Sequence, residues 1–170
     1  MQGQMLAVRQ GWKWLSTGEM LRTSTDPEVI AVLKSGELVS DELTYEVFDE
    51  AIQDARAKKY PNIIVDGFPR TKDQAEWLAD YMEKNEQKID LVVVLEVPEG
   101  EIMQRLAKRA RMEDTKDTIA RRMAIYRQKM YPVLGIFAEE NVSIIHLDGT
   151  GTAGEVHDRI YEELSSQNLA

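Results

Sequence analysis

Apolar residues occur along the chain in short continuous runs, and these runs alternate with longer segments of helical periodicity. A short apolar run is typical of a buried strand, and apolar residues spaced three or four apart are typical of an amphipathic helix. The pattern predicts strands at 12–15, 62–66, 90–97 and 142–147. It predicts helices at 3–10, just after 16–19, and at 27–35, 42–59, 72–85, 101–109, 115–140 and 154–166. This alternation indicates an α/β fold, in which a parallel sheet is covered by helices on both faces.

Capping residues and proline set the expected ends of several helices. Ser16 or Thr17 is expected to cap the helix that follows 16–19, and Asp41 is expected to cap the next long helix. Pro132 lies inside the helix expected at 115–140. Because proline lacks the backbone N–H that a helix interior requires, we expect a kink or a break there.

The composition is that of one globular domain. The chain has 170 residues, of which 43% are hydrophobic and 30% are charged, and this is enough for a hydrophobic core. No apolar run approaches the roughly 20 residues of a membrane span, and no signal-peptide core occurs at the N-terminus. The absence of cysteine excludes a disulfide and a thiolate zinc site. We therefore expect a cytoplasmic protein without a membrane partner.

The charge is unevenly distributed. A net charge of −9 disfavours a general nucleic-acid binder. Segment 101–131 nevertheless carries the basic residues Arg105, Lys108, Arg109, Arg111, Lys116, Arg121, Arg122, Arg127 and Lys129, against the acids Glu101, Glu113, Asp114 and Asp117. Arginines concentrated in one segment of an acidic protein favour an anionic ligand, and a solvated helix face is the alternative.

The candidate chemistry lies where the predicted strands end. Segment 66–70 (DGFPR) follows the second strand, and segments 16–18 (STG) and 148–150 (DGT) follow the first and the last. An aspartate at the carboxyl end of a parallel strand, such as Asp66, can hold magnesium directly or through water. An arginine just beyond it, such as Arg70, can bind a phosphate through two parallel hydrogen bonds. The combination indicates phosphate chemistry.

These motifs, taken in order along the chain, resemble those of nucleoside monophosphate kinases, and most closely those of adenylate kinases. The matching segments are 16–22 (STGEMLR), 36–43 (GELVSDEL), 66–70 (DGFPR) with Gln74, and 148–150, together with Arg105, Arg109, Arg111 and Arg122. The resemblance implies a P-loop kinase-type fold. It also implies a single domain over 1–170, with an AMP-binding subdomain at about 16–45 and a very short lid at about 109–114.

The resemblance implies phosphoryl transfer from ATP to AMP, which yields ADP, with Mg2+ as the cofactor. The AMP-binding residues it implies are Thr17, Arg22, Glu37, Val39, Gly67, Arg70, Gln74, Arg111 and Arg122. The ATP-binding residues are Arg105, Arg109, Thr150 and Gly151. The catalytic residues are Arg70, Arg105, Arg111, Arg122 and Asp66, and Asp66 is also the magnesium residue, holding the ion through water.

The chemistry of these side chains suits the implied roles. Arg22 and Arg70 can hold the AMP phosphate, and the donor and acceptor of the Gln74 amide suit the edge of adenine. Thr17 and Gln74 favour adenine, because pyrimidine-specific relatives usually carry alanine and asparagine there. A UMP/CMP kinase and a catalytically inactive AMP-binding module remain alternatives. A nucleic-acid binder that uses segment 101–131 is a third, disfavoured by the net charge.

The 170 residues contain no glycine-rich phosphate loop that ends in Gly-Lys-Ser/Thr. In the family this loop follows the first strand, which is central in the sheet, so the resemblance implies that the first strand and the P-loop are absent from this chain. We expect a truncation with impaired activity rather than an evolved loss, and a gap between strands 62–66 and 90–97. The oligomeric state stays open.

Other conspicuous side chains are expected to pack or to be solvated. The tryptophans and the histidine of the last strand are expected to be structural, at Trp12, Trp14, Trp77 and His146. The side chains expected on the surface are His157, Arg121 and Arg127.

Overall fold

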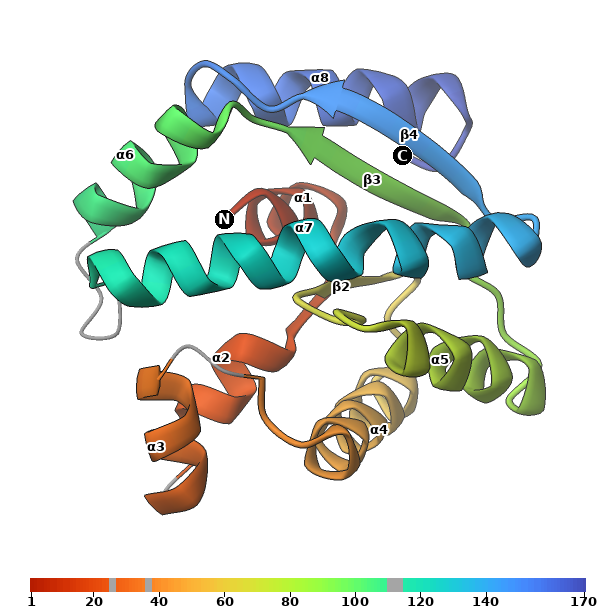
Figure 1. Ribbon diagram of the computed structural model, residues 1–170. Helices are drawn as coiled ribbons and strands as arrows, with labels where there is room; N and C mark the ends of the chain where they lie inside the picture. The colour runs from red at the N-terminus through yellow and green to blue at the C-terminus, as the bar shows by residue number, and fades with distance from the viewer. Residues whose placement is uncertain (25–26, 36–37, 110–114) are drawn as a thin grey trace. The chain divides into compact units, whose positions relative to one another are not determined.

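The computed structural model describes all residues except 25–26, 36–37 and 110–114, and also leaves out the side chains of residues 28, 107, 109 and 116. The described residues form eight helices and four strands (Figure 1). Their order is α1 (Gln2–Gln10), β1 (Lys13–Ser16), α2 (Thr17–Arg22), α3 (Pro27–Ser35), α4 (Asp41–Ala57), β2 (Ile63–Asp66), α5 (Lys72–Lys84), β3 (Leu91–Glu96), α6 (Glu99–Arg109), α7 (Lys116–Glu139), β4 (Ser143–Asp148) and α8 (Ala153–Ser166). The predicted alternation of strands and helices is confirmed, and none of the described helices is long and apolar enough to cross a membrane.

The strands form two parallel pairs. β1 lies beside β2, with Ser16 opposite Asp66, and β3 lies beside β4, with Glu96 opposite Asp148. Parallel neighbours require a crossover connection, which helices supply in both pairs. The register brings the carboxyl ends of the two strands in each pair to the same edge, where α/β proteins bind ligands.

The chain divides into two compact units, and each pair of strands belongs to one of them. The first unit comprises Met1–Leu33, Leu38–Phe68 and Gly149–Ala170, and the second comprises Lys34–Glu37 and Pro69–Asp148. The gap expected between strands 62–66 and 90–97 concerns the relation of the two units, and it stays a prediction.

Helices contact both faces of the β1–β2 pair in the first unit. The backbone of α1 lies so close to β1 that a Cβ atom on Gly3 would be 2.7 Å from Cδ1 of Trp14 and 3.3 Å from Cγ2 of Ile64. Since side chains alternate along a strand, Leu15 points to the opposite face. Leu15 is buried, and α4 also contacts β1. Trp14 is therefore a packing residue, as the sequence predicted.

α8 packs against α1 in the same unit. The Arg9 guanidinium lies 3.3 Å from the centre of the Tyr161 ring, and Nε2 of Gln2 donates to the carbonyl oxygen of Ala153 at 3.0 Å. His157 was expected on the surface, but its side chain is only 6% exposed. The reason is helical spacing, because residue 157 lies on the same face as the buried Ile160 and Leu164.

α7 is one continuous helix in the second unit, and the break expected at Pro132 does not occur. Pro132 removes one backbone donor from the helix. The residues just after it, Val133, Ile136 and Phe137, are buried, and α7 contacts both α5 and β4. This packing holds the helix together across the proline.

Two capping residues are settled by the structure. Ser16, rather than Thr17, caps α2, and its Oγ accepts from the N–H of Glu19 at 3.4 Å. Ser40 caps α4, so the expectation that Asp41 caps it is wrong. Serine and aspartate cap equally well, and one residue of difference decides which oxygen reaches the N–H groups. Asp41 instead lies in the first turn, where a negative charge favours the helix dipole.

Candidate active site

In the first unit, a hydrogen bond joins the two motifs that follow β1 and β2. The side chain of Thr17 is 2% exposed, and its Oγ1 donates to the carbonyl oxygen of Gly67 at 3.0 Å. Segments 16–18 and 66–68 therefore meet at the carboxyl ends of β1 and β2. The sequence predicted that both lie at this edge, but it did not predict the bond between them.

The turn after β2 is anchored by an aromatic cluster. Gly67 has a φ of 83°, a conformation that side chains with a Cβ rarely adopt. Phe68 then turns into the core, where its ring centre lies 4.8 Å from that of Phe48 and 6.3 Å from that of Tyr45. Asp66, the residue before this turn, is exposed at the end of the strand. The carboxylate of Asp66 is therefore accessible, and it lies next to a turn that packing holds in place.

Asp66 fits the kind of magnesium site that the sequence suggested. Among the described residues there is no group of three or more acidic or histidine side chains that could hold a metal ion. Magnesium is usually held by one or two carboxylates, together with waters and the phosphates of a substrate. A single exposed carboxylate at the end of a parallel strand matches the protein's share of that donor set.

Arg22 lies in the last turn of α2 and is held by a carboxylate of the same helix. Its Nη1 lies 2.8 Å from Oε1 of Glu19, in an i, i+3 pair whose side chains are partly exposed. The pair orients the guanidinium without burying it. The sequence predicted Arg22 as a phosphate ligand but did not assign a role to Glu19.

Val39, predicted beside the adenine, belongs to a small apolar cluster of the first unit. Its side chain packs with the buried Leu21 and Val29, and the partly buried members of the cluster are Val32, Leu33, Leu43 and Val47. The cluster joins α2, α3 and the start of α4. Val39 is thus a packing residue within 16–45, and the AMP-binding subdomain expected there stays a prediction.

The start of α5, in the second unit, carries a compact arrangement of Arg70, Thr71 and Gln74. The N–H of Arg70 donates to Oε1 of Gln74 at 2.7 Å, and the N–H of Gln74 donates to Oγ1 of Thr71 at 3.2 Å. The side chain of Gln74 is only 2% exposed, whereas Arg70 is exposed. Both residues were predicted to bind AMP, and the structure shows that they also bind each other.

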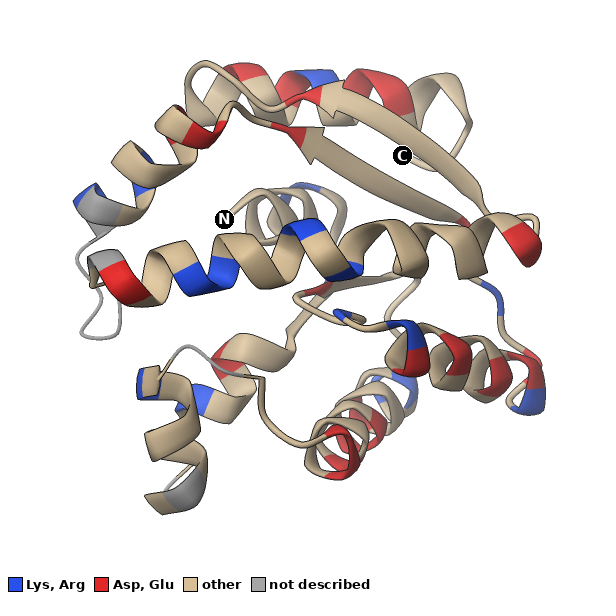
Figure 2. Cartoon of the chain, in the orientation of Figure 1, with Lys and Arg blue, Asp and Glu red and all other residues tan. Residues whose placement is uncertain are grey.

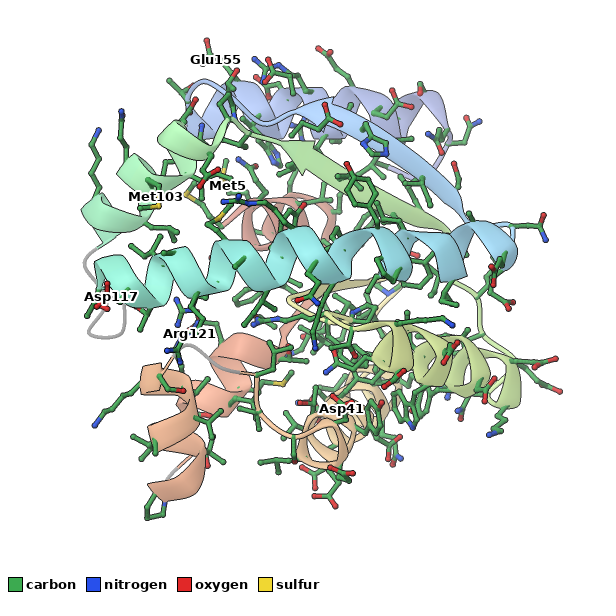
Figure 3. All side chains as sticks on the ribbon, viewed as in Figure 1. Met5, Asp41, Met103, Asp117, Arg121 and Glu155 are labelled. Carbon is green, nitrogen blue, oxygen red and sulfur yellow. The ribbon has the colours of Figure 1, made fainter. Side chains whose placement is uncertain are left out.

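The arginines of segment 101–131 lie mostly on α6 and α7, and Figure 2 shows basic positions along α7. Arg105 forms an ion pair with Glu101, and the predicted phosphate ligand Arg122 is half-buried on α7. Two arginines that were expected to be solvated have partners. Arg127 pairs with Glu99 at 2.7 Å, and Arg121, labelled in Figure 3, donates to the carbonyl oxygen of Ser35 at 3.3 Å.

Some predicted site residues lie outside the described part of the chain. These are Glu37, Arg111, the side chain of Arg109, and most of the lid expected at about 109–114. Their assignment rests on the sequence.

The loop before α8 contains Thr150 and Gly151, which were predicted to border ATP. Arg159 donates from Nη1 to the carbonyl oxygen of Thr150 at 2.8 Å. Gly151 has a φ of 96°, and a Cβ on it would lie 2.7 Å from Oε2 of Glu155. Two residues of α8 therefore shape this loop, and the start of that helix is marked by Glu155 in Figure 3.

Glu155 closes a capping box at the start of α8. Its carboxylate accepts from the N–H of Thr152 at 2.7 Å and from Oγ1 of Thr152 at 2.8 Å, and these bonds hold the pKa of Glu155 below its ordinary value. The spacing Thr-x-x-Glu before an apolar segment is a sequence signal for such a box. Arg159 has no comparable local signal, because its partner lies nine residues earlier.

The parallel strands, the anchored turn with its carboxylate and the arginine that follows it in sequence are the features from which the sequence predicted phosphate chemistry in an α/β protein. The model of the family "Adenylate kinase" matches residues 1–142. The adenylate kinase of Thermus thermophilus is 36% identical over 169 residues, which cover 94% of this chain and 87% of that protein. The adenylate kinase of Maricaulis maris is 36% identical over 165 residues (91% and 86%), and that of Salinibacter ruber is 30% identical over 198 residues (97% and 92%).

The chain therefore belongs to the adenylate kinase family. This confirms the resemblance seen in the sequence, the P-loop kinase-type α/β fold and the class of enzyme, which is a phosphotransferase acting as a nucleoside monophosphate kinase.

Proposed function

We propose that the chain transfers a phosphoryl group from ATP to AMP and so yields two molecules of ADP. The observation that carries this proposal is the arrangement at the start of α5. An exposed arginine, Arg70, and a buried amide, Gln74, are held together there directly after the DGF turn. An arginine suits a phosphate and an amide suits the edge of a base, so the pair matches a nucleoside monophosphate.

The proposed roles follow from the chemistry of each side chain. Arg22 and Arg70 bind the AMP phosphate, and each charge-assisted hydrogen bond contributes roughly 1.5–3 kcal/mol. Thr17, Val39 and Gln74 lie around the adenine, with Gly67 and Glu37 completing the AMP set. Arg105, Arg109, Arg111 and Arg122 neutralise charge on the transferring group. In phosphoryl transfer one such arginine can be worth roughly 10³–10⁵ in rate.

Asp66 is the proposed magnesium residue, holding the ion through water. The ion, when bound, neutralises the charge of the ATP phosphates. The chain's own contribution is to place an exposed carboxylate at the end of β2, on a turn anchored by Phe68 and by the bond from Thr17 to Gly67. Thr150 and Gly151 are proposed to border ATP on the loop that Glu155 and Arg159 shape. The cytoplasmic location stays a prediction.

The second candidate function is an AMP-binding module without kinase activity. It is favoured by the absence of a Gly-x-x-x-x-Gly-Lys-Ser/Thr motif from the 170 residues. Without backbone amides and a lysine preorganised around the ATP phosphates, the reaction loses much of its electrostatic stabilisation. We propose that the 170-residue chain alone is a poor kinase that still binds AMP. A UMP/CMP kinase is disfavoured by Thr17 and Gln74.

The experiment that tests this function compares two proteins in one ADP-formation assay. One is the 170-residue chain, and the other is the same chain preceded by a strand and a phosphate loop taken from a relative. We expect ADP from ATP and AMP with the extended protein, much less with the chain alone, and poor use of UMP and CMP by both. An extended protein that prefers UMP or CMP would reject the assignment to AMP, and near-normal turnover by the chain alone would reject the proposed impairment.

A further inference from the structure

The side chain of Arg159 reaches back from α8 to the loop that precedes this helix. Its Nη1 donates to the carbonyl oxygen of Thr150 at 2.8 Å, in a bond that is partly buried. The side chains of a helix lean towards its N-terminus, so an arginine in the second turn of α8 can reach the loop before the first turn. The bond therefore joins α8 to a residue that is proposed to border ATP.

The helix from which Arg159 extends is itself held in place. Val156 and Ile160, on the face that α8 buries, are 2% and 5% exposed. In addition, Nε2 of Gln2, at the start of α1, donates to the carbonyl oxygen of Ala153 at 3.0 Å. The place from which the guanidinium extends is therefore fixed by packing within the first unit.

The peptide group that Arg159 holds precedes a glycine. The carbonyl of Thr150 and the N–H of Gly151 form one planar unit, so a bond to the carbonyl also restrains the direction of that N–H. Gly151 is exposed and has a φ of 96°. Because glycine has more backbone freedom than any other residue, this part of the loop has many accessible conformations unless a contact restrains it.

A second residue of α8 lies against the same glycine. A Cβ on Gly151 would be 2.7 Å from Oε2 of Glu155 and 3.7 Å from Nη2 of Arg159, so both side chains are close to its backbone. Hydrogen bonds from Thr152, with a smaller contribution from the charge of Arg159, hold the pKa of Glu155 below its ordinary value. Glu155 is therefore charged at neutral pH, and it attracts the guanidinium that holds the loop.

We propose that Arg159 is a positioning residue for ATP, which it does not itself contact. It holds the peptide between Thr150 and Gly151 in one conformation, so a ligand that binds beside the loop does not have to order it. A site that is ordered before binding loses less conformational freedom on binding. The inference rests on the proposed function and deepens it, because it makes the affinity for ATP depend on the second turn of α8.

The test separates the two nucleotides. Binding of ATP and of AMP is measured by NMR titration of the wild-type chain and of Arg159→Met, which removes the donors and the charge. We expect Arg159→Met to bind ATP about three- to tenfold more weakly, the effect of ordering part of a loop on binding. It should bind AMP as the wild type does, because no residue proposed for AMP lies in this loop. Arg159→Lys keeps an N–H donor and the positive charge, so it should recover most of the affinity for ATP.

Arg9→Met is the matched control. It removes the same charge from the same unit, and the Arg9 guanidinium also contacts α8, where it lies 3.3 Å from the centre of the Tyr161 ring. It should bind ATP as the wild type does. An equal loss of ATP binding in Arg9→Met and Arg159→Met would assign the effect to charge or to the packing of α8, and would overturn the positioning role.

A second measurement reads the loop itself, without ligand. The NMR order parameter of the Gly151 amide should be about 0.85 in the wild type and in Arg159→Lys, the value of rigid backbone, and below about 0.6 in Arg159→Met. If Arg159→Met does not fold, a rigid amide in the wild type and in Arg159→Lys supports the inference, and a flexible amide in either one rejects it.

Failure of the inference can be told from failure of the proposed function. Unchanged ATP binding in a folded Arg159→Met would overturn the positioning role, even if the Gly151 amide becomes flexible. A wild-type chain in which ATP leaves the amide signals of 150–152 unperturbed would instead reject the proposed place of ATP beside this loop, on which the inference rests.

Discussion

The two arginines proposed for the AMP phosphate, Arg22 and Arg70, are restrained in different ways. The guanidinium of Arg22 is paired with the carboxylate of Glu19, whereas Arg70 is held through its backbone by Gln74. A partly exposed ion pair contributes little to stability, about 0–1 kcal/mol, and yields readily to a competing anion. Each restraint reduces the conformational freedom that binding of a phosphate must remove.

The first prediction concerns Arg70. Arg70→Ala should weaken AMP binding by roughly 1.5–3 kcal/mol, the value of a charge-assisted hydrogen bond, as measured by isothermal titration calorimetry. Arg127→Ala is the matched control, because it removes a guanidinium from the same unit that pairs with Glu99 and has no proposed ligand role. Undiminished AMP binding in Arg70→Ala, or an equal loss in Arg127→Ala, contradicts the assignment.

The second prediction concerns pH and the loop that Glu155 shapes. Hydrogen bonds from Thr152 hold the pKa of Glu155 below its ordinary value of 4.5, so the folded state favours the carboxylate. The stabilisation is therefore present above pH 4.5 and is lost as the pH falls through the lower pKa of the folded protein.

Exchange of the Thr152 amide, corrected for its intrinsic pH dependence, should accelerate as the carboxylate is protonated. Glu155→Gln keeps an oxygen acceptor but does not titrate, so it should show no such step. A step of the same size in Glu155→Gln would assign the effect to another group.

Among the secondary-structure elements, the pattern of the sequence predicted the strands and helices that the structure describes, because an element that buries one face repeats its apolar residues with the period of that element. Details that depend on contacts distant in sequence were not predictable. The bond from Thr17 to Gly67 joins residues 50 positions apart, and nothing in segment 66–70 reveals which side chain will meet its carbonyl. The burial of His157 and the continuity of α7 through Pro132 likewise depend on packing partners.

The cap of α4 was predicted to within one residue. Capping rules predict a side-chain oxygen at the start of the helix, but Ser40 and Asp41 both supply one, so the rules do not decide between them.

The close approach of α1 to β1 yields the third prediction. Gly3→Ala would place a Cβ 2.7 Å from Cδ1 of Trp14, so the helix or the indole must move. We expect a loss of about 1–3 kcal/mol in the free energy of unfolding, the usual range for overpacking, measured by urea denaturation.

Gly100→Ala in α6 is the matched control, because a Cβ there meets nothing within 4 Å. Alanine favours a helix over glycine by about 0.5–1 kcal/mol, so this variant should be as stable as the wild type or more stable. Equal stability of the two variants would show that Trp14 does not constrain residue 3.

At the scale of the whole molecule, the described strands form two separate parallel pairs rather than one sheet. The family resemblance implies a further strand between 62–66 and 90–97. An added strand would pair with β2 and β3 and would satisfy backbone groups on the open side of each.

The fourth prediction is that extending the chain with a strand and a phosphate loop slows amide exchange in β2 and β3. The amides of β1 and β4 are the internal control and should change little. An extension that protects β1 or β4 instead, or none of the four, would contradict the predicted place of the strand.

Calorimetric titration of the wild-type chain with AMP, CMP and UMP is the decisive measurement of the proposed AMP site. We expect saturable binding of AMP and binding of CMP and UMP that is at least about tenfold weaker, a difference of about 1.4 kcal/mol, comparable to one hydrogen bond to the base. No AMP binding by the folded chain, or binding of CMP or UMP as tight as that of AMP, would contradict it.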